Sequence, residues 1–131
     1  MKVFNFEKET DVDVIIVNAT IQSKYKLRLA LDTAATHSTI DNNVLYFTGY
    51  ELKNSKGEFE VETANGIIIV ERYDLFEFEC LGITKDVFEV QVYDFLSHGI
   101  ISDYDGVIGL DFLLNNKFCI DLQQKEISIQ L

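Results

Sequence analysis

The sequence predicts an all-β protein, and three features of its 131 residues support this fold class. Apolar and polar residues alternate with a period of two along most of the chain, and many apolar positions are β-branched or aromatic. Asn65-Gly66, a dipeptide typical of tight hairpin turns, separates two alternating segments. Helical signals are short and few. With 47% hydrophobic residues the chain can bury a core, so we expect one domain spanning residues 1–131.

The first part of the chain is expected to form strands at residues 3–6, 12–21 and 25–31. Residues 7–11 are charged and predict a turn, and the polar connection at 22–24 predicts a hairpin between residues 14–21 and 25–31. Next, Asp41-Asn42-Asn43 offers a helix cap to the apolar run at 44–47, which is long enough for only a turn or two of helix.

The remainder of the chain begins with residues 58–64 and 67–71, which flank Asn65-Gly66 and predict a long hairpin because both turn residues tolerate a positive φ. Four more strands are expected, together with one short helix that follows Gly109. The strands are 73–80 and 87–92, joined by residues 81–86, and 118–122 and 127–131, which enclose 123–125, while the helix is 110–116.

Charge and composition exclude several classes of function. The chain has 11 Lys and Arg against 22 Asp and Glu, and a net charge of -11 repels nucleic acid and anionic membranes. Cys80 and Cys119 stand in apolar runs, which predicts buried free thiols instead of a disulfide framework. His37 and His98 are isolated, so we expect no metal and no other cofactor. Without a signal peptide or an apolar stretch of membrane-spanning length, a cytoplasmic location is expected.

Two segments of the sequence contain residue patterns that are candidates for a catalytic site. In the first, an apolar strand runs directly into Asp32, and the small residues Thr33, Ala34 and Ala35 follow. Asp and Thr often close a strand by hydrogen bonding to nearby backbone, which is the structural explanation of this pattern. The second segment is Val107-Ile108-Gly109-Leu110-Asp111, in which two apolar residues precede a glycine and a helix. The occurrence of both segments in one chain favours a functional explanation.

Together the two segments resemble the retropepsin-like aspartic proteases in their single-lobe, homodimeric form. The catalytic loop of that family reads Asp-Thr/Ser-Gly-Ala, and its later segment has two hydrophobic residues, a glycine and a short helix. The hairpin at Asn65-Gly66 falls where the family has the flap that covers the substrate. The resemblance implies a retropepsin-like closed or partly open β-barrel with a flap hairpin and one short C-terminal helix.

The resemblance also implies a role for each matching residue. Asp32 is the expected catalytic carboxylate, and Thr33 is expected to bond across the pair of loops that meet in the active site. Ser38 and Ile40 would continue the loop into the next strand, and Asp111 would open the helix as an acid suited to its N-terminus. Loop support is assigned to Ala34, Ala35, Ile108 and Gly109, and the substrate-binding flap tip to Thr63, Ala64, Asn65 and Gly66.

This chemistry needs two carboxylates that share one proton, as in the aspartic proteases that serve as the standard example of such a pair. The chain has a single segment of the Asp32 type, so the pair has to come from two copies related by a two-fold axis. The expected activity is therefore that of an aspartic endopeptidase acting on extended polypeptide as a homodimer. Because two copies at -11 repel, dimerisation should strengthen as salt rises.

Ala34 keeps an alternative open, because the family has glycine at this position and an added methyl group could crowd the substrate or shift the loop. The alternative is a catalytically impaired module that dimerises or binds peptides without cleaving them. A third reading is an all-β ligand-binding domain in which the motifs are coincidental. Ser38 has no nearby base and no nucleophile-elbow pattern, so a serine hydrolase is not expected.

Overall fold

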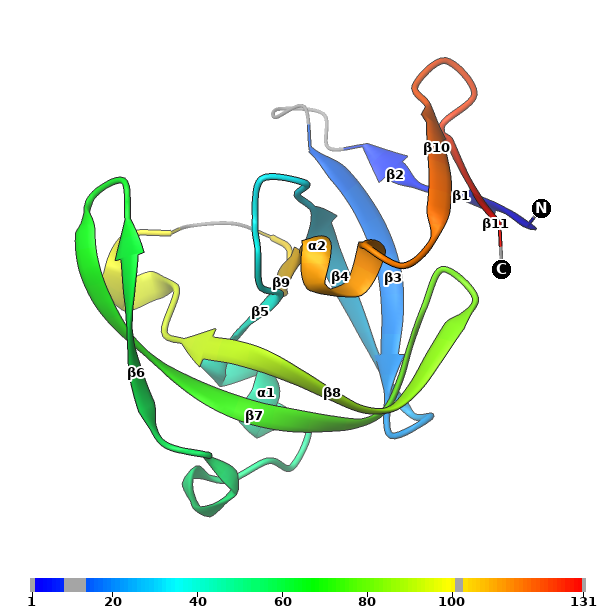
Figure 1. Cartoon of the computed structure of the whole chain (residues 1–131). Helices are drawn as coiled ribbons and strands as arrows, with labels where there is room; N and C mark the ends of the chain where they lie inside the picture. Colours follow the sequence, from blue (N-terminus) through cyan, green and yellow to red (C-terminus); the bar gives the residue numbers. More distant parts are fainter. Residues whose placement is uncertain (1, 9–13, 101–102, 131) are drawn as a thin grey trace.

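The computed structural model describes residues 2–8, 14–100 and 103–130, which fold mostly as β-strands (Figure 1). The strands are β1 Lys2–Asn5, β2 Glu7–Lys8, β3 Ile15–Ile21, β4 Tyr25–Leu31, β5 Thr39–Asp41, β6 Glu58–Thr63, β7 Gly66–Cys80, β8 Ile83–Tyr93, β9 Gly106–Ile108, β10 Lys117–Asp121 and β11 Glu126–Gln130. The helices are α1 Asn42–Phe47 and α2 Leu110–Leu113, and the 3-10 turns are η1 Leu52–Asn54 and η2 Leu96–His98. No helix in the described ranges is long and apolar enough to cross a membrane.

The larger sheet closes into a barrel. Its strand order is β2-β3-β4-β9-β5-β8-β7-β6, and a further pairing of β3 with β7 joins six of these strands, β3-β4-β9-β5-β8-β7, into a ring. Strands β2 and β6 lie outside the ring, and a separate three-stranded sheet has the order β1-β11-β10. The fold is therefore the predicted all-β barrel with a long hairpin and a short C-terminal helix.

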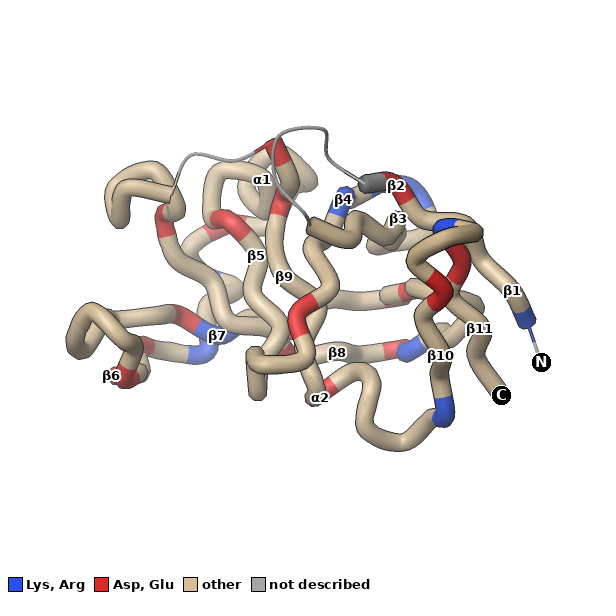
Figure 2. The backbone as a smooth tube through the Cα atoms, turned by 90° about the horizontal axis from the view of Figure 1, so that it is seen from above, with Lys and Arg blue, Asp and Glu red and all other residues tan. Residues whose placement is uncertain are grey.

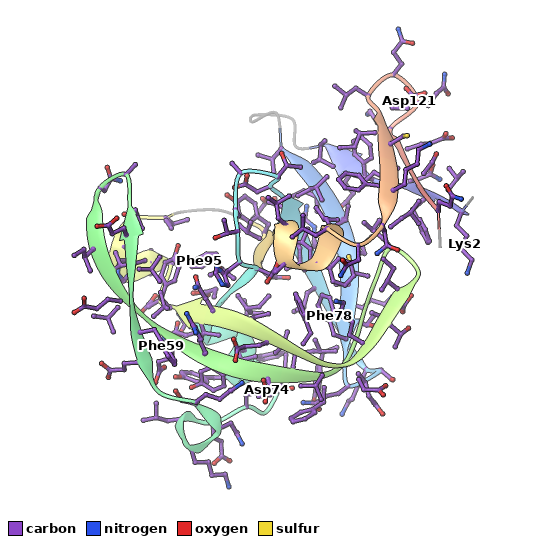
Figure 3. The ribbon with its side chains drawn as sticks, in the orientation of Figure 1. Lys2, Phe59, Asp74, Phe78, Phe95 and Asp121 are labelled. Carbon is purple, nitrogen blue, oxygen red and sulfur yellow. The ribbon has the colours of Figure 1, made fainter. Side chains whose placement is uncertain are left out.

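A single hydrophobic cluster fills the barrel and reaches the small sheet. Phe78, labelled in Figure 3, lies at its centre, with ring centroids 4.9 Å from Phe88 and 5.4 Å from Phe112. Ile127 and Ile129 of β11 are fully buried and belong to the same cluster. The period-two pattern of the sequence thus places one face of each sheet in a shared core.

The predicted strands near the N-terminus are confirmed with small changes of boundary. Strands β3 and β4 form the expected antiparallel hairpin, with Ile21 opposite Tyr25. Glu7 and Lys8, expected in a charged turn, form β2 and pair with Ile16 and Ile15 of β3. The rest of that predicted turn, at 9–11, and the first residues of the predicted 12–21 strand lie outside the described residues.

The second hairpin and the strands after it differ from the prediction. Strand β7 runs without a break for 15 residues because it pairs in turn with β6, β8 and β3. The expected connection at 81–86 contracts to the two residues Leu81 and Gly82, which both have positive φ, at 52° and 74°. This backbone combination suits a two-residue hairpin turn, so residues 83–86 join strand β8.

Three smaller expectations are also corrected. Helix α2 ends at Leu113, before two asparagines that are poor helix formers, instead of reaching residue 116. Asp41 occupies the cap position of α1 but makes no side-chain cap, because its carboxylate accepts a hydrogen bond from the backbone N–H of Phe95 at 3.0 Å. Cys80 is buried as expected, whereas Cys119 is exposed because it lies opposite Ser128, on the face of the small sheet that points away from the core.

Candidate active site

Asp32 follows directly after the last residue of strand β4. Leu27 and Leu29 of this strand are buried, and parallel pairing with β9 places Leu31 beside Ile108. The backbone N–H of Asp32 continues this pairing by donating to the carbonyl oxygen of Ile108 at 3.0 Å. Asp32 is half-buried, so its backbone is fixed by the barrel while its side chain keeps access to solvent.

The loop after Asp32 holds one oxygen of its carboxylate. The backbone N–H of Ala34 donates to Oδ1 of Asp32 at 2.9 Å, and the N–H of Ala35 donates to the carbonyl oxygen of Asp32 at 3.2 Å. Within the described residues the other carboxylate oxygen, Oδ2, accepts no hydrogen bond from the protein. Asp32 therefore has one anchored oxygen and one available for a ligand, and the turn expected from its residue types is also present.

Ala34 adopts an ordinary backbone conformation. The non-glycine residues with positive φ in the described ranges are Gln22, Ser23, Glu77, Leu81 and Lys125, and Ala34 is not among them. Its side chain is exposed. The methyl group therefore causes no backbone strain in this loop, and alanine can donate the hydrogen bond to Asp32 as well as glycine could.

A hydrogen-bonded latch fixes the far end of the loop to the β9–α2 junction. Ser38 is 1% exposed, and its hydroxyl donates to Oδ1 of Asp111 at 2.7 Å while accepting from the backbone N–H of Gly109 at 2.9 Å. The backbone N–H of Ser38 donates to Oδ2 of Asp111 at 2.9 Å. Both oxygens of the Asp111 carboxylate therefore bind Ser38, a role that the sequence analysis did not assign to either residue.

Gly109 lies against the loop in a close backbone approach, and the loop-support role that the resemblance implies for Gly109 and Ile108 stays a prediction. A Cβ atom on Gly109 would lie 2.6 Å from the carbonyl oxygen of Ala35, a distance that no side chain tolerates. That same carbonyl accepts a hydrogen bond from the N–H of Leu110 at 2.8 Å, and Ile108 is fully buried. Ala35 therefore sits directly on the junction, and glycine is required at 109.

Thr33 is exposed, and in the part of the chain that the structure describes its side chain has no hydrogen-bond partner. The bond across two loops that the resemblance implies for Thr33 needs a second copy of the loop. That role stays a prediction.

A small pocket with both polar and apolar lining opens beside Asp32. Its volume is about 280 Å³, and residues on three separate segments line it. Besides Asp32 the lining residues are Val14, Ile15, Ala30, Leu31, Tyr104 and Val107. Val107 stands in the second sequence motif, but no role in a pocket was expected for any of the six, because the parallel β4–β9 pairing that helps to assemble them joins residues 77 positions apart.

The predicted hairpin is present as β6 and β7, and its tip lies on the same side of the molecule as the loop after Asp32 (Figure 1). Thr63 pairs with Gly66, so Ala64 and Asn65 form the turn and only Gly66 has a positive φ, at 114°. The Thr63 hydroxyl closes the turn by donating to the carbonyl oxygen of Gly66 at 2.8 Å. All four tip residues are exposed, and no hydrogen bond joins them to Asp32 in the described ranges.

Other titratable groups do not form a second site of this kind. His37 is exposed with Nδ1 3.0 Å from the Thr36 hydroxyl, and Nδ1 of His98 lies 2.8 Å from the carbonyl oxygen of Asp94. Among the described residues no group of three or more His, Cys, Asp or Glu side chains could hold a metal ion. A larger pocket of about 400 Å³ lies beside α1, but its one acid, Asp105, accepts a hydrogen bond from the N–H of Arg28.

The closed barrel, the loop that begins at Asp32 and the glycine junction beneath it define an aspartic protease fold of the retropepsin-like class. A family model described as aspartyl protease matches residues 17–112 of this chain. The match covers most of the chain, which therefore belongs to the aspartyl protease family.

Solved structures agree with this fold. The crystal structure of a retropepsin-like aspartic protease from Rickettsia conorii superposes with a TM-score of 0.71 at 19% identity, covering 99% of each chain. The retroviral protease-like domain of Ddi1 from Leishmania major has a TM-score of 0.59 at 19% identity, covering 92% of this chain and 90% of that one. No curated protein matches the sequence.

Proposed function

We propose that this protein is an aspartic endopeptidase whose catalytic pair consists of Asp32 from each of two copies. The observation that carries the proposal is the position of the Asp32 carboxylate. Asp32 follows directly after β4, and one of its carboxylate oxygens accepts a hydrogen bond from the N–H of Ala34. The latch between Ser38 and Asp111 and the close packing at Gly109 keep this carboxylate in place. Such preorganisation is what a catalytic group requires.

The proposed reaction divides acid and base roles between the two carboxylates. The ionised one takes a proton from a water molecule, which attacks the peptide carbonyl, and the protonated one donates to the carbonyl oxygen, which gives a tetrahedral intermediate. The C–N bond then breaks as the first carboxyl gives its proton to the leaving nitrogen and the second takes a proton back from a hydroxyl of the intermediate. Because two carboxylates at hydrogen-bond distance cannot both ionise, the pair retains one proton. The sequence has a single loop of this type, so the two roles cannot both be filled within one copy.

The proposed substrate is an extended polypeptide segment bound beneath the flap. Edges of strands bind extended peptides through main-chain hydrogen bonds, and pockets select their side chains. The pocket of about 280 Å³ beside Asp32 is lined by aliphatic side chains together with Asp32 and Tyr104, so we expect it to take a side chain that has both apolar and polar atoms, next to the bond that is cut.

The test compares Asp32→Asn with Asp86→Asn, which removes the same charge from an exposed position on β8. Both variants and the unmodified protein are offered an unbiased peptide library, and the products are read by mass spectrometry. We expect Asp32→Asn to lose cleavage by a factor of at least about a thousand, since it removes the base of the pair, and Asp86→Asn to retain it. Cleavage that survives in folded Asp32→Asn would exclude Asp32 as the catalytic group.

The alternative, a module that binds peptides without cutting them, was motivated by Ala34, and Ala34→Gly tests it. The φ of Ala34 is already unstrained, so we expect this substitution to leave the turnover number within about a factor of three. A protein that is inactive with alanine and gains cleavage with glycine would show that the methyl group blocks the reaction and would support the alternative.

A further inference from the structure

The hairpin of β6 and β7 leaves one edge of β6 without a neighbouring strand. Strand β6 is the last strand of the eight-stranded sheet, and among the described residues it pairs with β7 alone. Figure 2 shows β6 at the margin of the molecule, on the side away from the small sheet. Unpaired N–H and C=O groups along such an edge are a template for another strand, so β6 can accept an extended segment from outside the chain.

The side chains of β6 divide into an acidic face and an apolar face. Glu58, Glu60 and Glu62, here called the Glu row, lie on one face and are exposed. Phe59 and Val61 lie on the other face and are half-buried. Directly opposite residues of paired strands project to the same face, so a strand added at this edge meets carboxylates on one face and apolar side chains on the other.

The hairpin itself supplies no cation to the Glu row. The residues opposite the row on β7 are Ile67, Ile69 and Glu71. Within the described ranges no ion pair or hydrogen bond involves any of the three carboxylates of the row. The guanidinium of Arg72 lies 3.9 Å from the centre of the Phe59 ring, which belongs to the other face. The negative charge of the row is therefore available to a partner.

Apolar surface lies beside the Glu row on the same face. Ile67 is 62% exposed and Ile69 is 48% exposed, although both are flanked by paired strands. The aliphatic stems of lysine and arginine pack on apolar surface while their charged ends reach carboxylates, so basic side chains suit this combination.

A second copy of this chain does not suit the edge. Pairing of β6 with another β6 brings two Glu rows together, and like charges opposite each other destabilise a sheet. Charged residues on a free edge are a known protection against aggregation. The same charges also make the edge selective, because an edge that repels acidic strands favours basic ones.

We propose that the free edge of β6 is a docking site for an extended segment of another protein in which basic and apolar residues alternate. Lys or Arg residues of the segment lie opposite the Glu row, its apolar residues lie opposite Phe59 and Val61, and main-chain hydrogen bonds run along the edge. No residue of β6 lines the pocket beside Asp32. The proposal goes beyond the proposed function, because docking at this edge requires neither Asp32 nor cleavage.

The first experiment measures the binding of two synthetic peptides by fluorescence anisotropy at low salt. The probe is Val-Lys-Val-Lys-Val-Lys-Val, and the control peptide, Val-Val-Lys-Lys-Lys-Val-Val, has the same composition and charge. We expect the probe to bind at least about tenfold more tightly, because only the probe places its three basic side chains on one face of a strand.

The second experiment changes the edge. Glu60→Lys reverses the charge at the centre of the Glu row, and Asp86→Lys makes the same change of charge at an exposed position of β8. We expect Glu60→Lys to weaken binding of the probe at least about tenfold and Asp86→Lys to change it less than about twofold. A peptide with Glu in place of the central Lys should bind Glu60→Lys more tightly than it binds the unmodified protein. This rescue also shows that Glu60→Lys folds.

The third measurement distinguishes strand pairing from attraction between charges. In an edge strand every second backbone N–H points away from the neighbouring strand, and an added strand protects these groups from hydrogen exchange. We expect the probe to slow exchange of such amides in residues 58–63, and the control peptide to leave them unchanged.

Equal binding of the two peptides, or equal losses in Glu60→Lys and Asp86→Lys, would overturn the docking site and leave the Glu row as a protection against aggregation. Binding of the probe without slower exchange in β6 would overturn it as well. These results are separable from those on catalysis. Docking at β6 by a protein that cleaves no peptide would keep the docking site and reject the protease, whereas Asp32-dependent cleavage without docking would do the reverse.

Discussion

At the scale of single residues, the candidate site depends on how a carboxylate at the end of an apolar strand is held. Asp32 could be recognised from the sequence because a charge at that position demands an explanation. The anchoring of its Oδ1 by Ala34 is local and follows from known turn chemistry. The binding of Ser38 by Asp111 spans 73 residues and could not be predicted, because a serine in a polar loop gives no sign of its burial.

Ser38→Ala tests the latch. The substitution removes the hydroxyl that donates to Asp111 and leaves the buried N–H of Gly109 without its acceptor. Leaving such a group unsatisfied costs about 1–3 kcal/mol, so we expect the free energy of unfolding to fall by about that amount in urea denaturation.

The matched control is Thr36→Ala in the same loop, where the exposed hydroxyl contacts only His37 and the expected change is within about 0.5 kcal/mol. Equal effects of the two substitutions would show that the latch contributes nothing specific.

At the scale of elements, the sequence predicted where the hairpins lie along the chain, but it did not predict which residues form their turns. The flap turn was expected to use Asn65 and Gly66 at positive φ, but Thr63 pairs with Gly66 and the turn shifts back by one residue. The sequence locates a turn by the residues that tolerate a positive φ. The pairing of the two strands determines which of these residues adopts it.

Gly66→Ala tests the importance of this turn. Gly66 has a φ of 114° and no atom within 4 Å of the position a Cβ would occupy, so the cost of alanine is conformational and not steric. Strained backbone of this type costs about 1–3 kcal/mol, which an exposed hairpin end can relieve by opening locally. We therefore expect faster hydrogen exchange of amides in the β6–β7 pairing.

Exchange elsewhere in the barrel should change little in Gly66→Ala. Asn65→Ala, at a position with negative φ, serves as the control and should leave exchange of the hairpin close to that of the unmodified protein. Uniform acceleration throughout the barrel would show that the turn is coupled to global unfolding instead.

The longer-range pairings show where sequence reasoning ends at this scale. The parallel pairing of β4 with β9 brings Leu31 to Ile108, and that of β5 with β8 brings Thr39 to Gln91. Alternation marks a strand and its buried face but contains no information about which distant strand lies beside it. The barrel was predicted from the resemblance of the two motifs to the retropepsin-like proteases, because periodicity alone does not predict which strands are neighbours.

At the scale of the whole molecule, closure of the barrel leaves few free edges. Among the described strands, the ring of six has no free edge, and the outermost strands of the two sheets are β2, β6, β1 and β10. Since closure removes edges that would otherwise aggregate, association through a remaining edge can be selective. The length of the chain and its single Asp32 loop require association for the proposed activity, while its charge opposes it.

This opposition predicts how dimerisation responds to salt. Two copies carry a net charge of -11 each, and their repulsion acts across the whole contact, whereas exposed ion pairs contribute little. The screening length shortens from about 30 Å at 0.01 M salt to about 3 Å at 1 M, so repulsion weakens more than the short-range contacts do. We expect the dissociation constant of the dimer, measured by sedimentation in sodium chloride, to fall as salt rises. At protein concentrations near that constant, Asp32-dependent cleavage should rise in parallel.

Sodium chloride is preferred to sulfate because sulfate also strengthens apolar burial and would mimic the effect. A dimer that weakens with salt would show that ion pairs, and not the net charge, control the association.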